Sequence, residues 1–134
     1  MQPSLSDSFH AGKTTIAVLG AGGWGTTLAI LLAGKGFAVR LWEYRKEAAE
    51  RLRAERENRE FLPGIPLPDE ILIHYDAGVC LHGVGGVVLA IPSQFVRGVL
   101  EKIHRNLPDD VVIVNAAKGI EETTLKRPSQ VVRD

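Results

Sequence analysis

The segment GAGGWG, residues Gly20–Gly25, lies between the apolar segment Thr15–Leu19 and the mainly apolar run Thr26–Leu32. This order predicts a strand, then a glycine turn, then a helix. A helix that begins in such a turn presents free backbone N–H groups and a partial positive charge to a pyrophosphate. The stretch therefore predicts a dinucleotide-binding site.

Three of these glycines are expected to have separate roles. Gly20 would permit the tight turn, and Gly22 would let phosphates approach the backbone. Gly25 would let the helix pack closely on the strand. Because glycines also collect in ordinary turns, the motif needs a second signal elsewhere in the chain.

An acidic residue at the end of a second strand supplies that signal. The segment Phe37–Trp42 is typical of a short strand, and Glu43 closes it. Glu43 follows Gly25 at close to the spacing of about 20 residues at which a carboxylate accepts the ribose hydroxyls of NAD. A solvated glutamate at the start of the next helix is the alternative interpretation, but the strand and glycine context favours the cofactor role.

The residues after Glu43 leave the choice of cofactor open. Arg45 lies two positions further on, where an arginine can neutralise the 2′-phosphate of NADP. A carboxylate repels that phosphate, so we expect NAD, with NADP as the alternative. Tyr44 either stacks on the adenine or covers the sheet edge.

Composition agrees with one α/β domain over residues 14–134, preceded by a mobile lead-in at 1–13. The chain carries 16 Lys and Arg against 16 Asp and Glu, which gives no reason to expect nucleic acid as a partner. A single cysteine, Cys80, rules out an internal disulfide, and no metal site is expected. We expect a cytoplasmic protein without a membrane span or signal peptide.

The remaining segments continue the alternation of a Rossmann-type doubly wound, mainly parallel sheet with helices on both faces. We expect helices at 45–61, at 76–82 and from Ser93 to about Arg105, and an ordered surface loop at 62–68, where prolines exclude a helix. We expect further strands at 71–75, 85–91 and 111–115, the last two buried.

Ligands of such sheets collect at the carboxyl ends of the strands, where two further segments lie. Pro92 and Phe95 follow one buried strand and should face the cofactor. Phe95 either flanks the nicotinamide side or has an ordinary role in the core of the next helix. Ser93 is expected to cap the next helix. Lys118 follows the last strand, where it is either a solvated charge or a cation directed at an anionic or carbonyl group of the substrate.

Taken together, these motifs resemble the N-terminal half of NAD(P)-dependent glycerol-3-phosphate dehydrogenase. The resemblance covers about residues 14–134 and rests on several separated segments. These are the GxGxWG turn at 20–25, the strand end at 42–45, the Asn58 to Leu-Pro-Gly loop, the Pro-x-x-Phe segment at 92–95, and the pair Lys118-Gly119. Gly23 stands where the family often has serine.

The resemblance implies hydride transfer between sn-glycerol 3-phosphate and dihydroxyacetone phosphate. Lys118 would contact the cofactor, help to hold the substrate and support catalysis through the electrostatics around the reacting oxygen. Gly23 and Trp24 would lie around the pyrophosphate, and Tyr44 and Phe95 would line the cofactor. The resemblance places the general acid/base lysine in a following helical domain, which these 134 residues do not contain. We therefore expect the chain alone to bind cofactor with little turnover, and an apolar patch near Phe95 and Ile120 to favour a homodimer.

Two alternatives stay open. A regulatory nucleotide-sensing domain would share the glycine turn and the acidic strand end, but it gives no reason for Lys118-Gly119 or the Leu-Pro-Gly loop. A cofactor domain from a related dehydrogenase of sugar acids or hydroxy acids is the closer competitor. The four histidines show no ligand spacing that would add a metal site to either interpretation.

Overall fold

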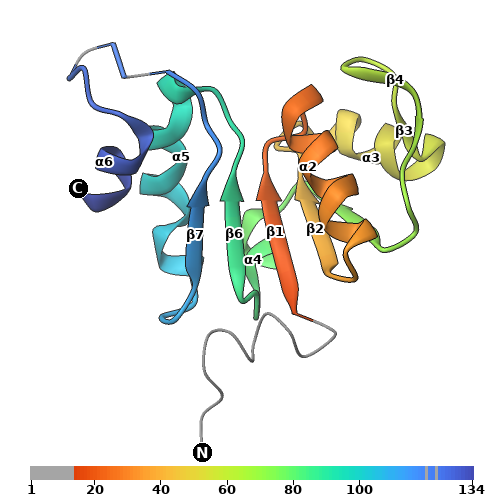
Figure 1. Cartoon of the computed structure of the whole chain (residues 1–134), viewed down its shortest axis with the longest axis horizontal. Helices are drawn as coiled ribbons and strands as arrows, with labels where there is room; N and C mark the ends of the chain where they lie inside the picture. The colour runs from red at the N-terminus through yellow and green to blue at the C-terminus, as the bar shows by residue number, and fades with distance from the viewer. Residues whose placement is uncertain (1–13, 120, 123) are drawn as a thin grey trace, which may run out of the picture.

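The computed structural model describes residues 14–119, 121–122 and 124–134. The expected lead-in at 1–13 and the Ile120 part of the expected apolar patch lie outside this range. The described part of the chain folds as a sheet covered by helices on both faces (Figure 1).

A parallel five-stranded sheet forms the centre of the fold, with the strand order β5-β2-β1-β6-β7. The first described strand, β1, lies in the middle of the sheet. Strands β2 and β5 follow on one side of β1, and β6 and β7 follow on the other side. This reversal between β1 and β6 is the switch point where doubly wound sheets bind ligands, and it confirms the predicted Rossmann-type fold. The strands are β1 (Thr15–Leu19), β2 (Ala38–Trp42), β5 (Ile71–His74), β6 (Gly86–Leu89) and β7 (Val112–Asn115).

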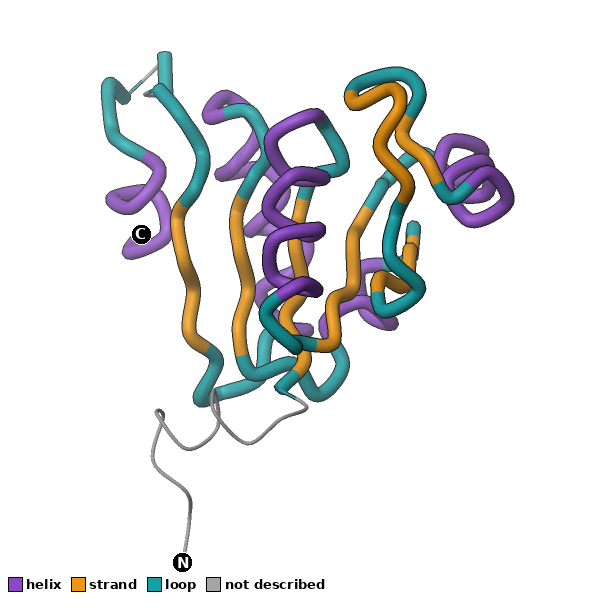
Figure 2. Tube along the Cα trace, turned by 45° about the vertical axis from the view of Figure 1, so that its right-hand side comes forward, coloured by secondary structure: helices purple, strands orange, loops and turns teal. Residues whose placement is uncertain are grey.

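The helices divide between the two faces of the sheet. Figure 2 shows one helix, α2, crossing one face, with other helices behind the sheet. The helices are α2 (Gly23–Gly34) and α3 (Lys46–Glu55), then α4 (Ala77–Leu81), α5 (Ser93–Ile103) and α6 (Pro128–Arg133), with a short 3₁₀ turn, η1 (His104–Asn106), after α5.

Strand β1 divides its buried side chains between the two cores. Ile16 and Val18 pack in the cluster that contains residues of α2 and α3. Ala17 and Leu19 pack in the cluster that contains residues of α4, α5 and α6. Because side chains alternate along a strand, a run buried on both faces must be apolar at every position, which is the pattern seen in the sequence.

The helix predicted over 45–61 ends earlier, at Glu55. Arg56 adopts a left-handed conformation (φ 54°), and its guanidinium donates to the carbonyls of Pro68 and Ile71 at 2.6 and 2.9 Å. These contacts are distant in sequence, so helix propensity alone does not reveal where α3 ends. The prediction was wrong beyond residue 55.

The segment predicted as a loop at 62–68 contains a strand, so this prediction was also wrong in part. Strand β4 (Leu62–Pro66) pairs antiparallel with β3 (Glu57–Asn58) in a separate two-stranded hairpin. The register shifts between Glu57 and Asn58, and four of the five β4 residues are exposed. Prolines are compatible with such an irregular, exposed strand because few of its N–H groups are needed for pairing.

Strand β7 was predicted as buried, but it is half-buried at its start and exposed at its end. Among the described strands, only β6 pairs with it. Val114 is therefore 51% exposed although its sequence context is as apolar as that of β6. The sequence predicts that β7 is an apolar strand, whereas the position of β7 at the edge of the sheet decides how exposed its side chains are.

Cys80, on α4, is fully buried, and this burial raises the pKa of its thiol to about 12. Because the thiolate is the reactive form, we expect the folded chain to react with a thiol reagent at pH 8 at least about a thousandfold more slowly than the unfolded chain. Absorbance kinetics with and without denaturant measure this ratio. Comparable rates in the two conditions would contradict the burial of Cys80.

No helix within the described residues is both long and apolar enough to cross a membrane. Nor do the histidine, cysteine and acidic side chains at 14–119, 121–122 and 124–134 form a cluster of three or more that could hold a metal ion.

Candidate functional site

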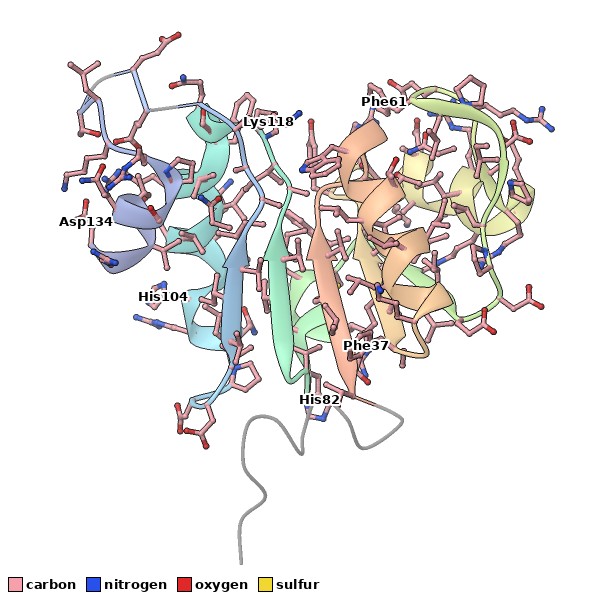
Figure 3. The ribbon with its side chains drawn as sticks, viewed as in Figure 1. Phe37, Phe61, His82, His104, Lys118 and Asp134 are labelled. Atoms are coloured by element: carbon pink, nitrogen blue, oxygen red, sulfur yellow. The ribbon has the colours of Figure 1, made fainter. Side chains whose placement is uncertain are left out.

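The carboxyl ends of β1, β2, β6 and β7 surround a cavity of about 480 Å³, named here the glycine-turn cavity. Figure 3 shows two of its lining residues, Phe61 and Lys118, at the same end of the sheet. Phe37 and His82 lie at the opposite end. All predicted cofactor residues except Phe95 and Gly25 line this cavity: Gly20, Gly22, Gly23, Trp24, Glu43, Tyr44, Arg45, Pro92 and Lys118.

The three glycines that the motif singles out differ in their surroundings. At Gly20, φ is +116°, and a Cβ would lie 2.8 Å from the carbonyl oxygen of Ala90. At Gly25, a Cβ would lie 1.8 Å from the carbonyl oxygen of Gly20. At Gly22, the N-cap of α2, a Cβ would meet no atom of the described residues within 4 Å beyond its chain neighbours. Contacts within the protein thus require glycine at positions 20 and 25, whereas Gly22 borders the glycine-turn cavity.

Trp24 links the first turn of α2 to the segment after β7. Its indole N–H donates to the carbonyl of Ala116 at 3.0 Å. The ammonium of Lys118 lies 5.2 Å from the centroid of the Trp24 ring, which is a cation–π distance. The structure therefore places Lys118 beside the start of α2, although the two are far apart in sequence.

At the other side of the cavity, Arg45 joins two carboxylates. Its Nε donates to Oε1 of Glu43 at 2.5 Å, and its backbone N–H points to the same oxygen at 3.3 Å. Its Nη2 lies 3.2 Å from Oε2 of Glu60. The hydrogen bonds to Glu43 and Glu60 raise the pKa of Arg45, so the guanidinium stays charged. Glu43 itself is 5% exposed, as expected for a carboxylate held at the end of β2.

A second cavity of about 800 Å³, named here the aromatic cavity, adjoins the first. Trp42, Tyr44, Ile91 and Pro92 line both cavities. Phe95 lines only the aromatic cavity and is 63% exposed. It does not share a cavity with Lys118, so its position does not support the expected place on the nicotinamide side.

Ser93 does not occupy the predicted N-cap. It is the first residue of α5 itself, and Pro92 occupies the cap position. Proline at the cap fixes an extended entry into the helix, with φ −56° and ψ 141°. The capping prediction was wrong by one position.

Asn58, on β3, supports the glycine turn from the hairpin and is 3% exposed. Its amide nitrogen donates to the carbonyl of Ala21 and to the hydroxyl of Thr26, both at 2.8 Å. Its amide oxygen accepts from the N–H of Phe61 at 3.3 Å. The sequence singled out Asn58 only as part of a resemblance, because nothing local signals a contact with a turn so far away in the chain.

Replacing Asn58 by alanine should lower the free energy of unfolding by about 2–3 kcal/mol, because the buried carbonyl and hydroxyl lose their donor. Chemical denaturation measures this change. The Asn58→Asp variant keeps the size but puts a charged acceptor against the Ala21 carbonyl, so it should be at least as destabilised. If Asn58→Asp were as stable as the wild type, the role of Asn58 would be only to fill space.

The sequence did not assign Phe61, Trp42 or Glu60 to the site, but all three contribute. Phe61 and Trp42 line the glycine-turn cavity, and Glu60 pairs with Arg45. The Phe61 carbonyl lies 3.1 Å from where a Cβ of Gly23 would be, so the hairpin approaches the turn closely. The one signal available for Phe61 was an aromatic residue three positions after Asn58.

Comparison with known proteins agrees with this geometry. A glycerol-3-phosphate dehydrogenase [NAD(P)+] of Chlorobium phaeobacteroides is 50% identical over 117 residues, covering 87% of this chain and 35% of the relative. That of Moorella thermoacetica is 49% identical over 120 residues, covering 90% of this chain and 36% of the relative. The chain thus spans about a third of the length of these curated relatives.

Solved structures give the same result. The crystal structure of glycerol-3-phosphate dehydrogenase from Coxiella burnetii superposes with a TM-score of 0.84 at 33% identity, over 90% of this chain and 37% of that one. The enzyme from Saccharomyces cerevisiae gives 0.78 at 26% identity, over 90% and 39%. A family model described as NAD-dependent glycerol-3-phosphate dehydrogenase N-terminus matches residues 15–134. The resemblance in the sequence is confirmed: the chain belongs to the family of N-terminal domains of NAD-dependent glycerol-3-phosphate dehydrogenases.

Proposed function

We propose that this chain binds NAD, with NADP as the alternative, for a glycerol-3-phosphate dehydrogenase. The observation that carries the proposal is the N-terminus of α2. At Gly22 a Cβ would meet no atom of the described residues within 4 Å beyond its chain neighbours, and the space beside it is the glycine-turn cavity. A pyrophosphate fits there because backbone N–H groups and the helix dipole favour an anion.

The adenosine half of the dinucleotide is assigned to the end of β2. Both hydrogen bonds from Arg45 end on Oε1 of Glu43, which leaves Oε2 to accept from a ribose hydroxyl. Tyr44 is 71% exposed and Phe95 63% exposed, and both line the aromatic cavity. An adenine ring covering such exposed aromatic side chains removes apolar surface from water. We therefore assign Phe95 to the adenosine side.

The reacting end is assigned to Lys118. This exposed lysine stands at the carboxyl end of β7, and its ammonium lies over the ring of Trp24. A positive charge there attracts a phosphate-bearing substrate and stabilises negative charge that develops on a carbonyl oxygen. The reaction we propose is the interconversion of sn-glycerol 3-phosphate and dihydroxyacetone phosphate, in which the nicotinamide supplies or accepts the hydride. Lys118 binds and orients the substrate in this scheme.

Calorimetric titration of the purified chain with NADH tests the cofactor proposal. We expect saturable binding, which is weakened when an excess of pyrophosphate competes for the N-terminus of α2. Circular dichroism of the same sample shows whether the chain is folded. A folded chain that takes up no NADH and no NADPH would contradict the proposal.

A further inference from the structure

One guanidinium, that of Arg45, is shared between a buried and an exposed carboxylate. Glu43 stands at the end of β2, whereas Glu60 comes from the turn between β3 and β4. The two Nη atoms of Arg45 face the two oxygens of Glu60, at 3.4 Å for Nη1 to Oε1 and 3.2 Å for Nη2 to Oε2. This is a fork-to-fork arrangement, which fixes the orientation of the guanidinium plane as well as its position.

We propose that Glu60 is a specificity-determining residue that disfavours a 2′-phosphorylated dinucleotide by holding Arg45 away from the phosphate. The inference rests on the proposed dinucleotide function. It assigns to the β3–β4 hairpin a part in choosing between the two cofactors, in addition to its support of the glycine turn through Asn58.

The charges at this corner explain the direction of the effect. Glu43, Arg45 and Glu60 together carry one net negative charge. A ribose hydroxyl donates a hydrogen bond to a carboxylate, so a 2′-hydroxyl suits Glu43. A 2′-phosphate brings about two more negative charges and needs Arg45 as its partner. Arg45 can bind the phosphate only if its Nη groups stop donating hydrogen bonds to Glu60.

Exposure sets the size of the effect. The side chain of Arg45 is 40% exposed and that of Glu60 is 47% exposed. An ion pair so open to water changes an affinity by at most about fivefold, because water and salt screen it. Glu60 is therefore expected to bias the choice of cofactor by a moderate factor and not to exclude either one.

Neighbouring carboxylates do not share this role. Arg59 lies 3.7 Å from Oε2 of Glu55 and 3.7 Å from Oε1 of Glu57, so it engages both. Neither carboxylate pairs with Arg45 among the described residues. Glu55 nevertheless lines the same small cavity of about 50 Å³ as Arg45 and Glu60. The Glu55→Gln variant thus removes the same charge from the same region without freeing Arg45.

The test is the ratio of NADPH to NADH affinity, measured by calorimetric titration of the chain and its variants in one buffer. We expect Glu60→Gln to raise this ratio by roughly twofold to fivefold, because Arg45 is then released from a carboxylate. In the Arg45→Gln background, Glu60→Gln should leave the ratio unchanged, because the effect passes through Arg45. Glu55→Gln should also leave it unchanged.

The outcomes separate the two proposals. Failure of the folded wild-type chain to bind either nucleotide overturns the dinucleotide function and this inference with it. Binding by the wild type with an equal or lower ratio in Glu60→Gln overturns the role of Glu60 alone. An equal rise in Glu55→Gln, or a rise that persists without Arg45, also overturns it, since general charge would then suffice.

Discussion

The Gly25→Ala variant is expected to lose at least about 3 kcal/mol of its free energy of unfolding, the largest effect on stability that the site predicts. The added Cβ would lie 1.8 Å from the carbonyl oxygen of Gly20 and 3.2 Å from the Cβ of Ala90. Backbone atoms on both sides must shift to relieve the first contact. That shift separates α2 from β1 and β6 at the switch point of the sheet.

Urea denaturation of Gly25→Ala against Gly98→Ala measures this effect with a matched control. Both glycines lie within helices, and at Gly98 a Cβ would meet nothing within 4 Å. The control should gain about 0.5–1 kcal/mol from the lower entropy of its unfolded chain. If Gly25→Ala were as stable as the control, the close approach of α2 to the Gly20 carbonyl would be contradicted.

The Gly22→Val variant is expected to lose NADH affinity by at least about a hundredfold while it stays folded. At Gly22 the backbone is extended, with φ −76° and ψ −172°, a conformation that valine adopts readily. Apart from its chain neighbours, no atom of the residues that the structure describes lies within 4 Å of the new Cβ. The isopropyl group therefore occupies the space assigned to the pyrophosphate, and stability should change by about 1 kcal/mol at most.

Paired titrations with NADH and melting curves separate binding from folding in this variant. Gly34→Val is the matched control, because Gly34 ends the same helix and a Cβ there also meets nothing within 4 Å. The control should bind NADH like the wild type. If a folded Gly22→Val chain kept its NADH affinity, the proposal that the pyrophosphate binds at the N-terminus of α2 would be contradicted.

Together these two variants test whether the motif contains glycine at positions 22 and 25 for different reasons. Gly25 is needed by the protein itself, and its replacement is felt without any ligand. No contact within the described part of the chain needs glycine at position 22, so its replacement should affect the protein only when the nucleotide binds. A glycine that the fold does not require, beside a cavity, is the clearest sign of a ligand in this structure.

Much of the fold could be predicted because its signals are local. The continuous apolar run that forms β6 predicts a strand buried on both faces, and each of its four residues is buried. The short helix expected at 76–82 is present as α4, with the carboxylate of Asp76 accepting from the N–H of Val79. These features depend on residues near one another in the chain.

The errors arose where distant contacts override local preference. Helix formers continue past Glu55, but Arg56 is drawn to the carbonyls of Pro68 and Ile71, and Asn58 to the glycine turn. The hairpin β3–β4 follows from those contacts. Likewise β7 is apolar enough to be central, yet it lies at an edge of the described sheet.

The sequence by itself determined the order of the five sheet strands and of helices α2 to α5, but not the β3–β4 hairpin or α6. It also determined the glycine turn and the carboxylate at the end of β2, because spacing and periodicity are read along one chain. Only the tertiary structure decided which side chains share a cavity. It brings Lys118 to Trp24, Glu60 to Arg45, and Phe95 to the cavity that Tyr44 lines. The physical reason is that a parallel sheet gathers the ends of its strands at one edge, whatever their separation in sequence.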